Sequence, residues 1–303
     1  MRWGDFRRSD NVEDRTGMDP GVRVPRGGGI RLGGGALVVI VIASLIFGVN
    51  PLEMIGALEG GGPAAPPASR QPPATGSGPR GGPAPGSSRA APAAQDPAKD
   101  FAAAVLGDTE DVWKAVFQAM GARYEPPRLV LFRRATQSAC GNASAATGPF
   151  YCSADRELYL DTAFFGELSR RFGAPGDFAQ AYVIAHEVGH HVQNLTGTMG
   201  KVDRRMQALD ARGRNALSVR LELQADCYAG IWGYFAQRRD KLEVGDLEEG
   251  FRAAAAVGDD EIQKRAQGYV VPESFTHGTA AQRLKWFRTG LESGDLRRCN
   301  TFD

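Results

Sequence analysis

The feature that most limits how this chain can fold is a long segment without large apolar side chains. From Gly60 to about Lys99 the sequence consists mainly of Gly, Pro, Ala and Ser with isolated arginines. Such a segment cannot bury enough apolar surface to offset the entropy lost on ordering, so we predict a flexible linker over residues 50–99. About 200 residues follow it, which is enough for one folded domain over residues 100–303.

An apolar run precedes this linker. Residues 32–49, LGGGALVVIVIASLIFGV, carry no charge and approach the length that a helix needs to cross a bilayer. Seven arginines precede the run, and the next basic residue after it is Arg70. By the positive-inside rule we expect residues 1–31 to form a cytoplasmic tail and the domain to lie on the extracytoplasmic side of a single-pass membrane protein. A cleaved signal peptide is the alternative, but the preceding tail is long and contains acidic residues.

The charge of the chain argues against nucleic acid as a partner. The net charge is +1, and the arginines are interspersed with carboxylates rather than collected into a basic stripe.

Four cysteines follow the apolar run, on the side where disulfides would persist. Three pairings are possible. We favour Cys140 with Cys152, which closes a loop of small residues, and Cys227 with Cys299, which fastens the C-terminal tail to the domain. A zinc-thiolate site is the competing interpretation, but no CxxC or similar short spacing supports it.

Apolar periodicity predicts an α+β domain that is mostly helical with a small β-sheet. Short apolar runs at 128–132 (RLVLF) and 157–161 (ELYLD) indicate strands of one sheet. Caps and stops predict the following helices: from Thr109 to Gly121, from about 162 to Gly173, from Asp177 to about Leu195, from Ala216 to Arg239, and shorter ones from Asp246, near Asp260 and from Thr279.

The stretch AYVIAHEVGHHVQN, residues 181–194, holds three of the four histidines of the chain. On a helix, His186 and His190 lie one turn apart on the same face and can bind one metal ion together. HExxH is the signature of zinc metallopeptidases, in which the glutamate, here Glu187, is the general base. Two histidines without a metal would be the alternative, but the apolar flanks indicate a buried helix where unpaired polar groups are costly. His191 points about 100° away, which suits a structural or substrate-facing role.

A catalytic zinc needs a third protein ligand, and LELQADCYAG supplies two carboxylates four residues apart. We predict Glu222 as the third ligand and Asp226 as the residue that hydrogen-bonds a ligand histidine. A solvated acidic face is the alternative, but the neighbouring residues are mostly apolar or small. His277 and Arg283 are candidates for stabilising the oxyanion that forms during peptide hydrolysis, although a histidine before a helix could also serve as a cap.

Several motifs together resemble one known family. MRW and NVEDR at the N-terminus, HEVGHHVQN, LELQADCYAG, GDDEIQK and SFTHGTAAQR are similar to the bacterial membrane-anchored family of putative neutral zinc metallopeptidases. The resemblance covers the chain apart from the linker. It implies a zincin-like peptidase domain with His186, His190 and Glu222 as zinc ligands, Glu187 as base, Asp226 in the ExxxD motif, and His277 with Arg283 assisting the site.

The residues and the resemblance favour a membrane-anchored zinc endopeptidase acting on protein or peptide substrates in the cell envelope. Two alternatives stay open at this point: a non-catalytic zinc-containing scaffold of the cell envelope, and a zinc hydrolase of a non-peptide amide. The same ligands would serve all three, but a structural zinc has no use for a glutamate beside its ligand histidine.

Overall fold

The computed structural model of the protein describes residues 1–18, 96–144 and 147–303. The apolar run at 32–49 and nearly all of the expected linker lie outside these residues. Within the described ranges, no helix combines the length and apolar character needed to span a bilayer.

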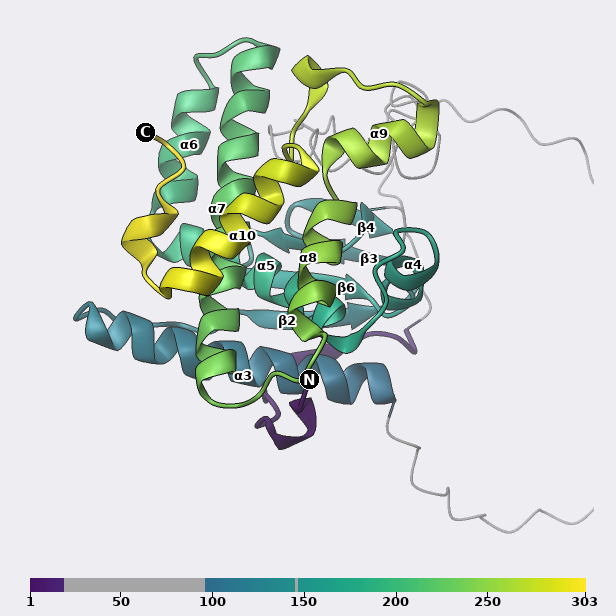
Figure 1. Ribbon diagram of the computed structural model, residues 1–303, viewed down its shortest axis with the longest axis vertical. Coiled ribbons are helices and arrows are strands. Elements are labelled where there is room, and N and C mark those ends of the chain that lie inside the picture. Colours follow the sequence, from purple (N-terminus) through teal and green to yellow (C-terminus); the bar gives the residue numbers. More distant parts are fainter. Residues whose placement is uncertain (19–95, 145–146) are drawn as a thin grey trace, which may run out of the picture.

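A four-stranded sheet forms one layer of the domain (Figure 1). Its strand order is β1 (Val12–Asp14), β2 (Arg128–Phe132), β6 (Glu157–Asp161) and β5 (Phe150–Cys152). The pairs β1–β2 and β2–β6 are parallel, whereas β5 runs antiparallel to β6. Two further strands, β3 (Ala135–Ser138) and β4 (Gly141–Ser144), pair with each other as a hairpin. The two strands predicted from sequence are confirmed with their bounds, and they pair directly.

Helices make up most of the described chain, which confirms the mostly helical α+β prediction. They are α3 (Pro97–Ala119), α4 (Phe164–Arg170), α5 (Asp177–Leu195), α6 (Thr198–Met206), α7 (Ala211–Arg238), α8 (Asp246–Ala256), α9 (Asp259–Gln267) and α10 (Ala280–Ser293), with short 3-10 turns η1 (Trp3–Asp5), η3 (Pro272–Ser274) and η4 (Leu296–Cys299).

Three helix predictions need correction at their starts. Helix α3 begins at Pro97 rather than at Thr109, because Asp96 caps it by accepting a hydrogen bond from Ala98 N. Helix α7 likewise begins earlier than expected, after the cap Asp210. Asp177 is the first residue of α5 rather than its cap, since Gly176 takes the cap position with φ 118°. Helix α6 has no counterpart among the predictions.

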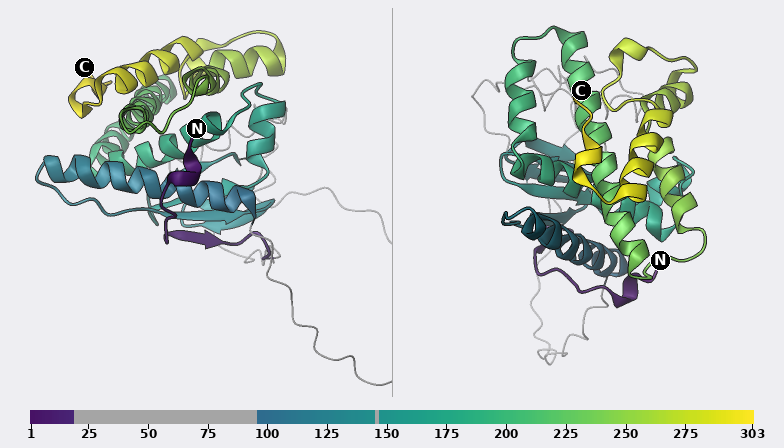
Figure 2. Two further views of the ribbon diagram at one scale, coloured as in Figure 1. Left: turned by 60° about the horizontal axis from the view of Figure 1, so that its bottom comes forward. Right: turned by 60° about the vertical axis from the view of Figure 1, so that its left-hand side comes forward.

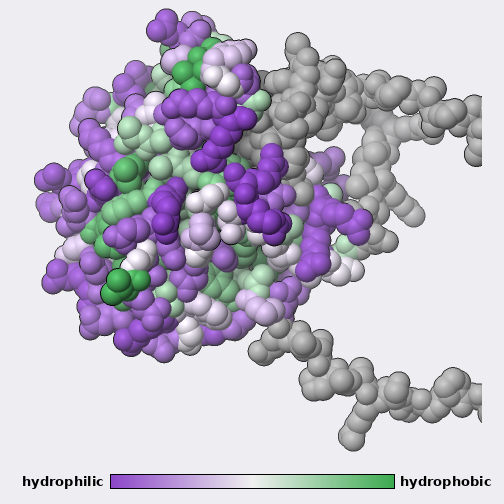
Figure 3. Space-filling view, turned by 45° about the vertical axis from the view of Figure 1, so that its right-hand side comes forward, coloured by the Kyte–Doolittle hydropathy of each residue, from purple (hydrophilic) through white to green (hydrophobic). Residues whose placement is uncertain are grey.

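The helices stack on the sheet in layers. Figure 2 (left) shows α3 against the sheet and the later helices α8 and α10 farther from it. Helix α5 lies inside, because it packs against α3, α7 and α8. Fully buried aromatic rings fill the spaces between the layers, among them Trp113, Phe178 and Trp232. The face drawn in Figure 3 is mostly hydrophilic, with apolar residues between the polar ones. The core therefore surrounds α5.

Residues 1–18 belong to the folded domain, which corrects the expectation that residues 1–31 form a separate tail. Strand β1 adds to the edge of β2, with Val12 opposite Leu129. The side chains of Met1 and Phe6 are buried in the main core. The packed unit thus comprises residues 1–18 together with the chain from Asp96 onwards, four residues before the predicted boundary.

The structure contains both of the disulfides that we favoured. Cys140–Cys152 joins the turn of the β3–β4 hairpin to β5. Cys227–Cys299 joins α7 to the turn η4 near the C-terminus. The second disulfide fastens the end of the chain to the helix that carries Glu222 and Asp226.

Candidate metal centre

Helices α5 and α7 approach each other closely because small residues meet at their crossing. A Cβ atom added to Gly189 would lie 2.9 Å from the carbonyl oxygen of Ala225 and 3.0 Å from its Cα. A larger residue at position 189 would therefore force the two helices apart. Gly189 directly precedes His190, and Ala225 directly precedes Asp226. The crossing thus brings the HEVGH and ELQAD segments against each other.

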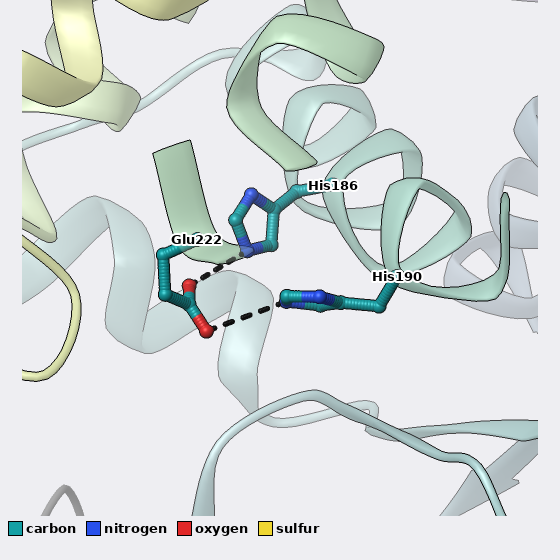
Figure 4. Close-up of side chains that lie close together, drawn as sticks. All are labelled: His186, His190 and Glu222. Atoms are coloured by element: carbon teal, nitrogen blue, oxygen red, sulfur yellow. Dashed lines mark hydrogen bonds and ion pairs between the residues drawn. The ribbon is translucent and has the colours of Figure 1, made fainter. Parts of the chain in front are cut away.

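Three side chains from these helices converge on one point, as Figure 4 shows. His186 Nε2 lies 3.1 Å from Glu222 Oε2, and His190 Nε2 lies 3.4 Å from Glu222 Oε1. One donor atom from each residue lies within 4.8 Å of the other two. Ligand atoms about 2 Å from a tetrahedral Zn²⁺ are about 3.3 Å apart. Two imidazoles and a carboxylate at this spacing fit zinc, so the structure brings together the three ligands that the sequence predicts.

His186 is oriented by a buried network. Its Nδ1 lies 2.9 Å from Asp226 Oδ1, and because a carboxylate only accepts hydrogen bonds, Nδ1 donates and Nε2 faces Glu222. Asp226 is 0% exposed and also accepts a hydrogen bond from the hydroxyl of Tyr182. Asp226 therefore stands where the ExxxD spacing puts it. Tyr182 is a member of the network that sequence analysis missed.

Arg283 completes the network behind His186. Its Nε and Nη2 donate to the two oxygens of Asp226 at 2.8 and 2.9 Å, and its Nη1 donates to the carbonyl of Val257 at 3.1 Å. The side chain is buried, and its Nη2 is 3.9 Å from Glu222 Oε2. We had considered Arg283 as an oxyanion stabiliser. These contacts make Arg283 a buried support for Asp226, and its role in stabilising an oxyanion stays a prediction.

His190 has an orienting partner of its own. Its Nδ1 lies 2.9 Å from Gln193 Oε1, and the amide nitrogen of Gln193 donates to Leu221 O at 2.7 Å. The amide nitrogen of Gln193 is thus a donor, so its oxygen accepts from His190 Nδ1–H and leaves Nε2 for a metal. Sequence analysis missed Gln193, although its position three residues after a ligand histidine on the same helix face is a usable signal.

Glu187 lies beside the ligands, half-buried on α5. Burial raises the pKa of its carboxyl, and the charges of His186 and His190 oppose this rise. In the described part of the chain its carboxylate has no hydrogen-bond partner. It is therefore available to accept a proton from a water molecule.

His277 lies in the loop between η3 and α10. Its Nδ1 is 3.1 Å from Asp259 Oδ1, and the other oxygen of Asp259 accepts hydrogen bonds from the backbone N–H groups of Thr276, His277 and Gly278. Asp259, the first residue of α9, thus fixes both the loop and the imidazole. Asp259 lies in the GDDEIQK motif, whose sequence alone does not indicate this contact.

The electrostatics of the centre favour a bound cation. Burial alone would raise the pKa of Glu222, but His190, His277 and His186 hold it well below its usual value. Burial alone would lower the pKa of His186, but Asp226 and Glu222 raise it to about 9. These carboxylates favour a positive charge at His186, and a metal ion that binds there has to displace any proton on Nε2.

His191 belongs to the structural framework rather than to the metal centre. Its Nε2 donates to the carbonyl of Glu125 at 2.7 Å, and its Nδ1 accepts from the hydroxyl of Tyr151 at 3.1 Å. Burial lowers the pKa of His191 to about 4, so the ring is neutral. Of its two suggested roles, the structural one fits these contacts.

The described residues form a groove of about 810 Å³, which none of His186, Glu187, His190, Glu222 and His277 lines. Leu223 and Gly278 line it, and they directly follow Glu222 and His277 in the sequence. The rest of its lining comes from α7, α9, η3, the start of α10 and the C-terminal tail.

Comparisons with known proteins agree with this geometry. The profile of a family described as putative neutral zinc metallopeptidase matches residues 1–302. The uncharacterized protein YpfJ of Escherichia coli K12 is 44% identical over 309 residues, which cover 100% of this chain and 99% of that protein. An uncharacterized protein of Mycobacterium tuberculosis H37Rv is 44% identical over 202 residues, which cover 63% of this chain and 66% of that protein. No solved structure is significantly similar to the chain.

Proposed function

The chain belongs to the family of putative neutral zinc metallopeptidases, and from this we propose that it is a zinc-dependent endopeptidase acting on protein or peptide substrates. Zinc is the metal that the family implies. The observation that carries the proposal is the convergence of His186, His190 and Glu222 at the spacing of tetrahedral ligands. Three protein ligands leave one position open, as catalytic rather than structural zinc requires.

When bound there, zinc supplies a Lewis acid that polarises a carbonyl and lowers the pKa of water. The residues of the chain would do the rest. Glu187 takes a proton from the attacking water onto its carboxylate and later gives it to the departing amine. Its raised pKa suits both transfers near neutral pH, because burial brings the carboxyl closer to the operating pH.

His277 would stabilise the negative charge that develops on the substrate oxygen. Asp259 engages its Nδ1, and its Nε2 has no hydrogen-bond partner in the described ranges. Burial alone would lower the pKa of His277, but Glu222 and Asp259 raise it, which favours the protonated donor. The groove lined by Leu223 and Gly278 offers space for substrate side chains.

The Glu187→Gln variant tests this proposal. With full-length protein and a broad peptide library, we expect cleavage to fall about 10²- to 10⁴-fold while the protein still binds one zinc per chain. Glu248→Gln is the matched control, since Glu248 is exposed on α8. Equal turnover by wild type and Glu187→Gln would remove Glu187 from the mechanism. A wild-type protein without stoichiometric zinc would overturn the proposal itself.

The role of His277 is tested by how the kinetic constants change. We expect His277→Phe to lower kcat about 100-fold with little change in KM, as for loss of an oxyanion donor. Asp259→Asn should have a smaller effect on kcat and should shift the pH dependence, because Asp259 favours the charged imidazole. A change in KM alone would contradict this role.

We propose that the domain works on the extracytoplasmic side, on the strength of its two disulfides. A single membrane crossing by residues 32–49 stays a prediction from the sequence, and it is incompatible with one compartment for residues 1–18 and the domain. The expected arrangement put the N-terminus on the opposite side of the membrane from the domain. The packing of residues 1–18 on the domain argues instead for one shared compartment.

Labelling with a membrane-impermeant thiol reagent in intact cells tests this placement. Gly4→Cys and Val244→Cys each introduce a thiol at an exposed position. Labelling of both variants supports a shared extracytoplasmic location. Labelling of only Val244→Cys would restore the cytoplasmic N-terminus, and labelling of neither would place the domain inside.

A further inference from the structure

Residues 1–18 form an arm that crosses α3. Its first residue, Met1, lies at the start of α5, the helix that carries His186 and His190. The arm is the purple segment in Figures 1 and 2, and in Figure 1 its N-terminus lies at one end of α8. The mechanism described above uses none of its residues.

The amino group of Met1 is bound by carboxylates. Its nitrogen lies 2.9 Å from Asp177 Oδ1, 3.0 Å from Glu243 Oε2 and 3.1 Å from Asp246 Oδ1. The side chain of Met1 is 0% exposed, whereas Glu243 is largely in solvent. Asp177, Asp246 and Glu249 lie close enough together to hold a cation. The cation in this structure is the chain's own amino group.

Two helix starts meet at this ammonium. Asp177 is the first residue of α5, and Asp246 is the first residue of α8. Glu249 of α8 also accepts a hydrogen bond from the backbone of Phe178 at 3.1 Å. Without the ammonium, three or four carboxylates would repel one another where α5 and α8 begin.

The middle of the arm fits a surface on α3. A Cβ atom added to Gly107 would overlap the carbonyl oxygen of Arg7, so only glycine admits the arm there. The buried Glu110 accepts hydrogen bonds from Arg7, Ser9 and Asn11 at 2.6–2.9 Å. Such specific pairing of buried polar groups indicates a defined docked state of the arm.

Two of the three proposed metal ligands, His186 and His190, lie on α5, whose first residue contacts the amino group of Met1. Asp177 precedes His186 by about two and a half turns of α5, or about 14 Å along one rigid helix. A displacement at the start of α5 would therefore move His186 and His190 relative to Glu222 on α7. Ligand positions off by a few tenths of an ångström weaken a metal site.

We propose that the docked arm, through the amino group of Met1, is a positioning element for the metal-binding helix. Docking of the arm and binding of zinc are thereby coupled. The inference rests on the proposed zinc site. The first measurement below, hydrogen exchange in zinc-free protein, does not depend on that site.

The test compares full-length protein with a native N-terminus to protein with a short Gly-Ser extension before Met1. The control carries the same extension after the exposed C-terminal Asp303. The first readout is hydrogen exchange of the α5 amides in zinc-free protein. The second is zinc affinity, measured by competition with a chelator. Asp246→Asn supplies an independent variant, because it weakens the ammonium site without lengthening the chain.

We expect the N-terminal extension and Asp246→Asn to speed exchange in the first turns of α5 and to weaken zinc binding at least about fivefold. The C-terminal extension should change neither. Unchanged exchange in α5 would overturn the inference whatever the metal does. Faster exchange with unchanged zinc affinity would mean that the arm only stabilises the fold, and this result would also overturn the inference. If no variant binds zinc but exchange changes as expected, the proposed function fails and the holding of α5 by the arm survives.

Discussion

Arg283 offers the sharpest test of how the metal centre is built. We consider Arg283→Met, which keeps much of the side-chain volume and removes the guanidinium. The change strips two hydrogen bonds from Asp226, which is 0% exposed, and one from Val257 O. Asp226 would keep Tyr182 and His186 as partners but would lose its compensating charge.

The size of the effect follows from the burial of this pair. Breaking a buried ion pair by removing one partner typically destabilises a protein by about 3–5 kcal/mol. Replacing both charged partners costs much less, because no buried charge is left unpaired. We therefore expect Arg283→Met to lower the free energy of unfolding by about 3 kcal/mol or more, and the double variant Arg283→Met/Asp226→Asn to recover part of that loss.

The assay is denaturant unfolding of zinc-free protein, with both disulfides intact. Arg288→Met on the same helix is the matched control; its guanidinium is exposed above the ring of Phe251, and we expect a loss below about 1 kcal/mol. A loss under 1 kcal/mol for Arg283→Met, or a double variant no more stable than the single one, would refute the reasoning. A large fall in kcat at unchanged stability would return Arg283 to the role of oxyanion stabiliser.

Three further predictions concern the metal, the tail and the arm. Glu222→Gln removes the anionic ligand, so we expect zinc affinity to fall at least about 100-fold by chelator competition, and unchanged affinity would exclude Glu222 as a ligand. Replacing Cys227 and Cys299 by serine opens a loop of sequence separation 72 and should destabilise the domain by about 4 kcal/mol in thermal or urea unfolding; a loss below 1 kcal/mol would contradict this. The third is a pH dependence: burial alone would lower the pKa of the Met1 amino group, but Asp177, Glu243 and Asp246 raise it from 8.0 to about 10. The stabilisation is therefore complete below pH 8 and is lost as the pH rises from 8 to 10, with a size of about 1–2 kcal/mol after allowance for solvent at Glu243. An N-terminally extended protein should lack this loss, and an identical pH profile in both proteins would count against the ion pair.

Some of the site could be predicted from sequence because its information is local. The spacing of four residues puts His186 and His190 on one face of α5, with Glu187 next to His186 in the sequence. The same spacing puts Glu222 and Asp226 on one face of α7. The strands at 128–132 and 157–161 could also be predicted, because a short apolar run between turn residues is recognised without knowledge of its partner strand.

Other features depend on segments that are far apart in the sequence. No local pattern tells that Asp259 would bind His277 or that Arg283 would pair with Asp226 instead of facing the substrate. Sequence analysis assigned the N-terminal residues to a tail, because their arginines resembled a topology signal. In the folded chain Arg7 and Arg8 pair with Glu110 and Asp100 of α3.

By itself, the sequence determined which side chains could bind a metal and on which helices they lie, since periodicity within one helix follows from backbone geometry alone. Only the tertiary structure decided how those helices meet, which groups orient the ligands and where the N-terminal arm docks. These depend on the packing of surfaces such as Gly189 against Ala225 and Gly107 against Arg7. Such complementarity arises between distant segments only when the whole chain is folded.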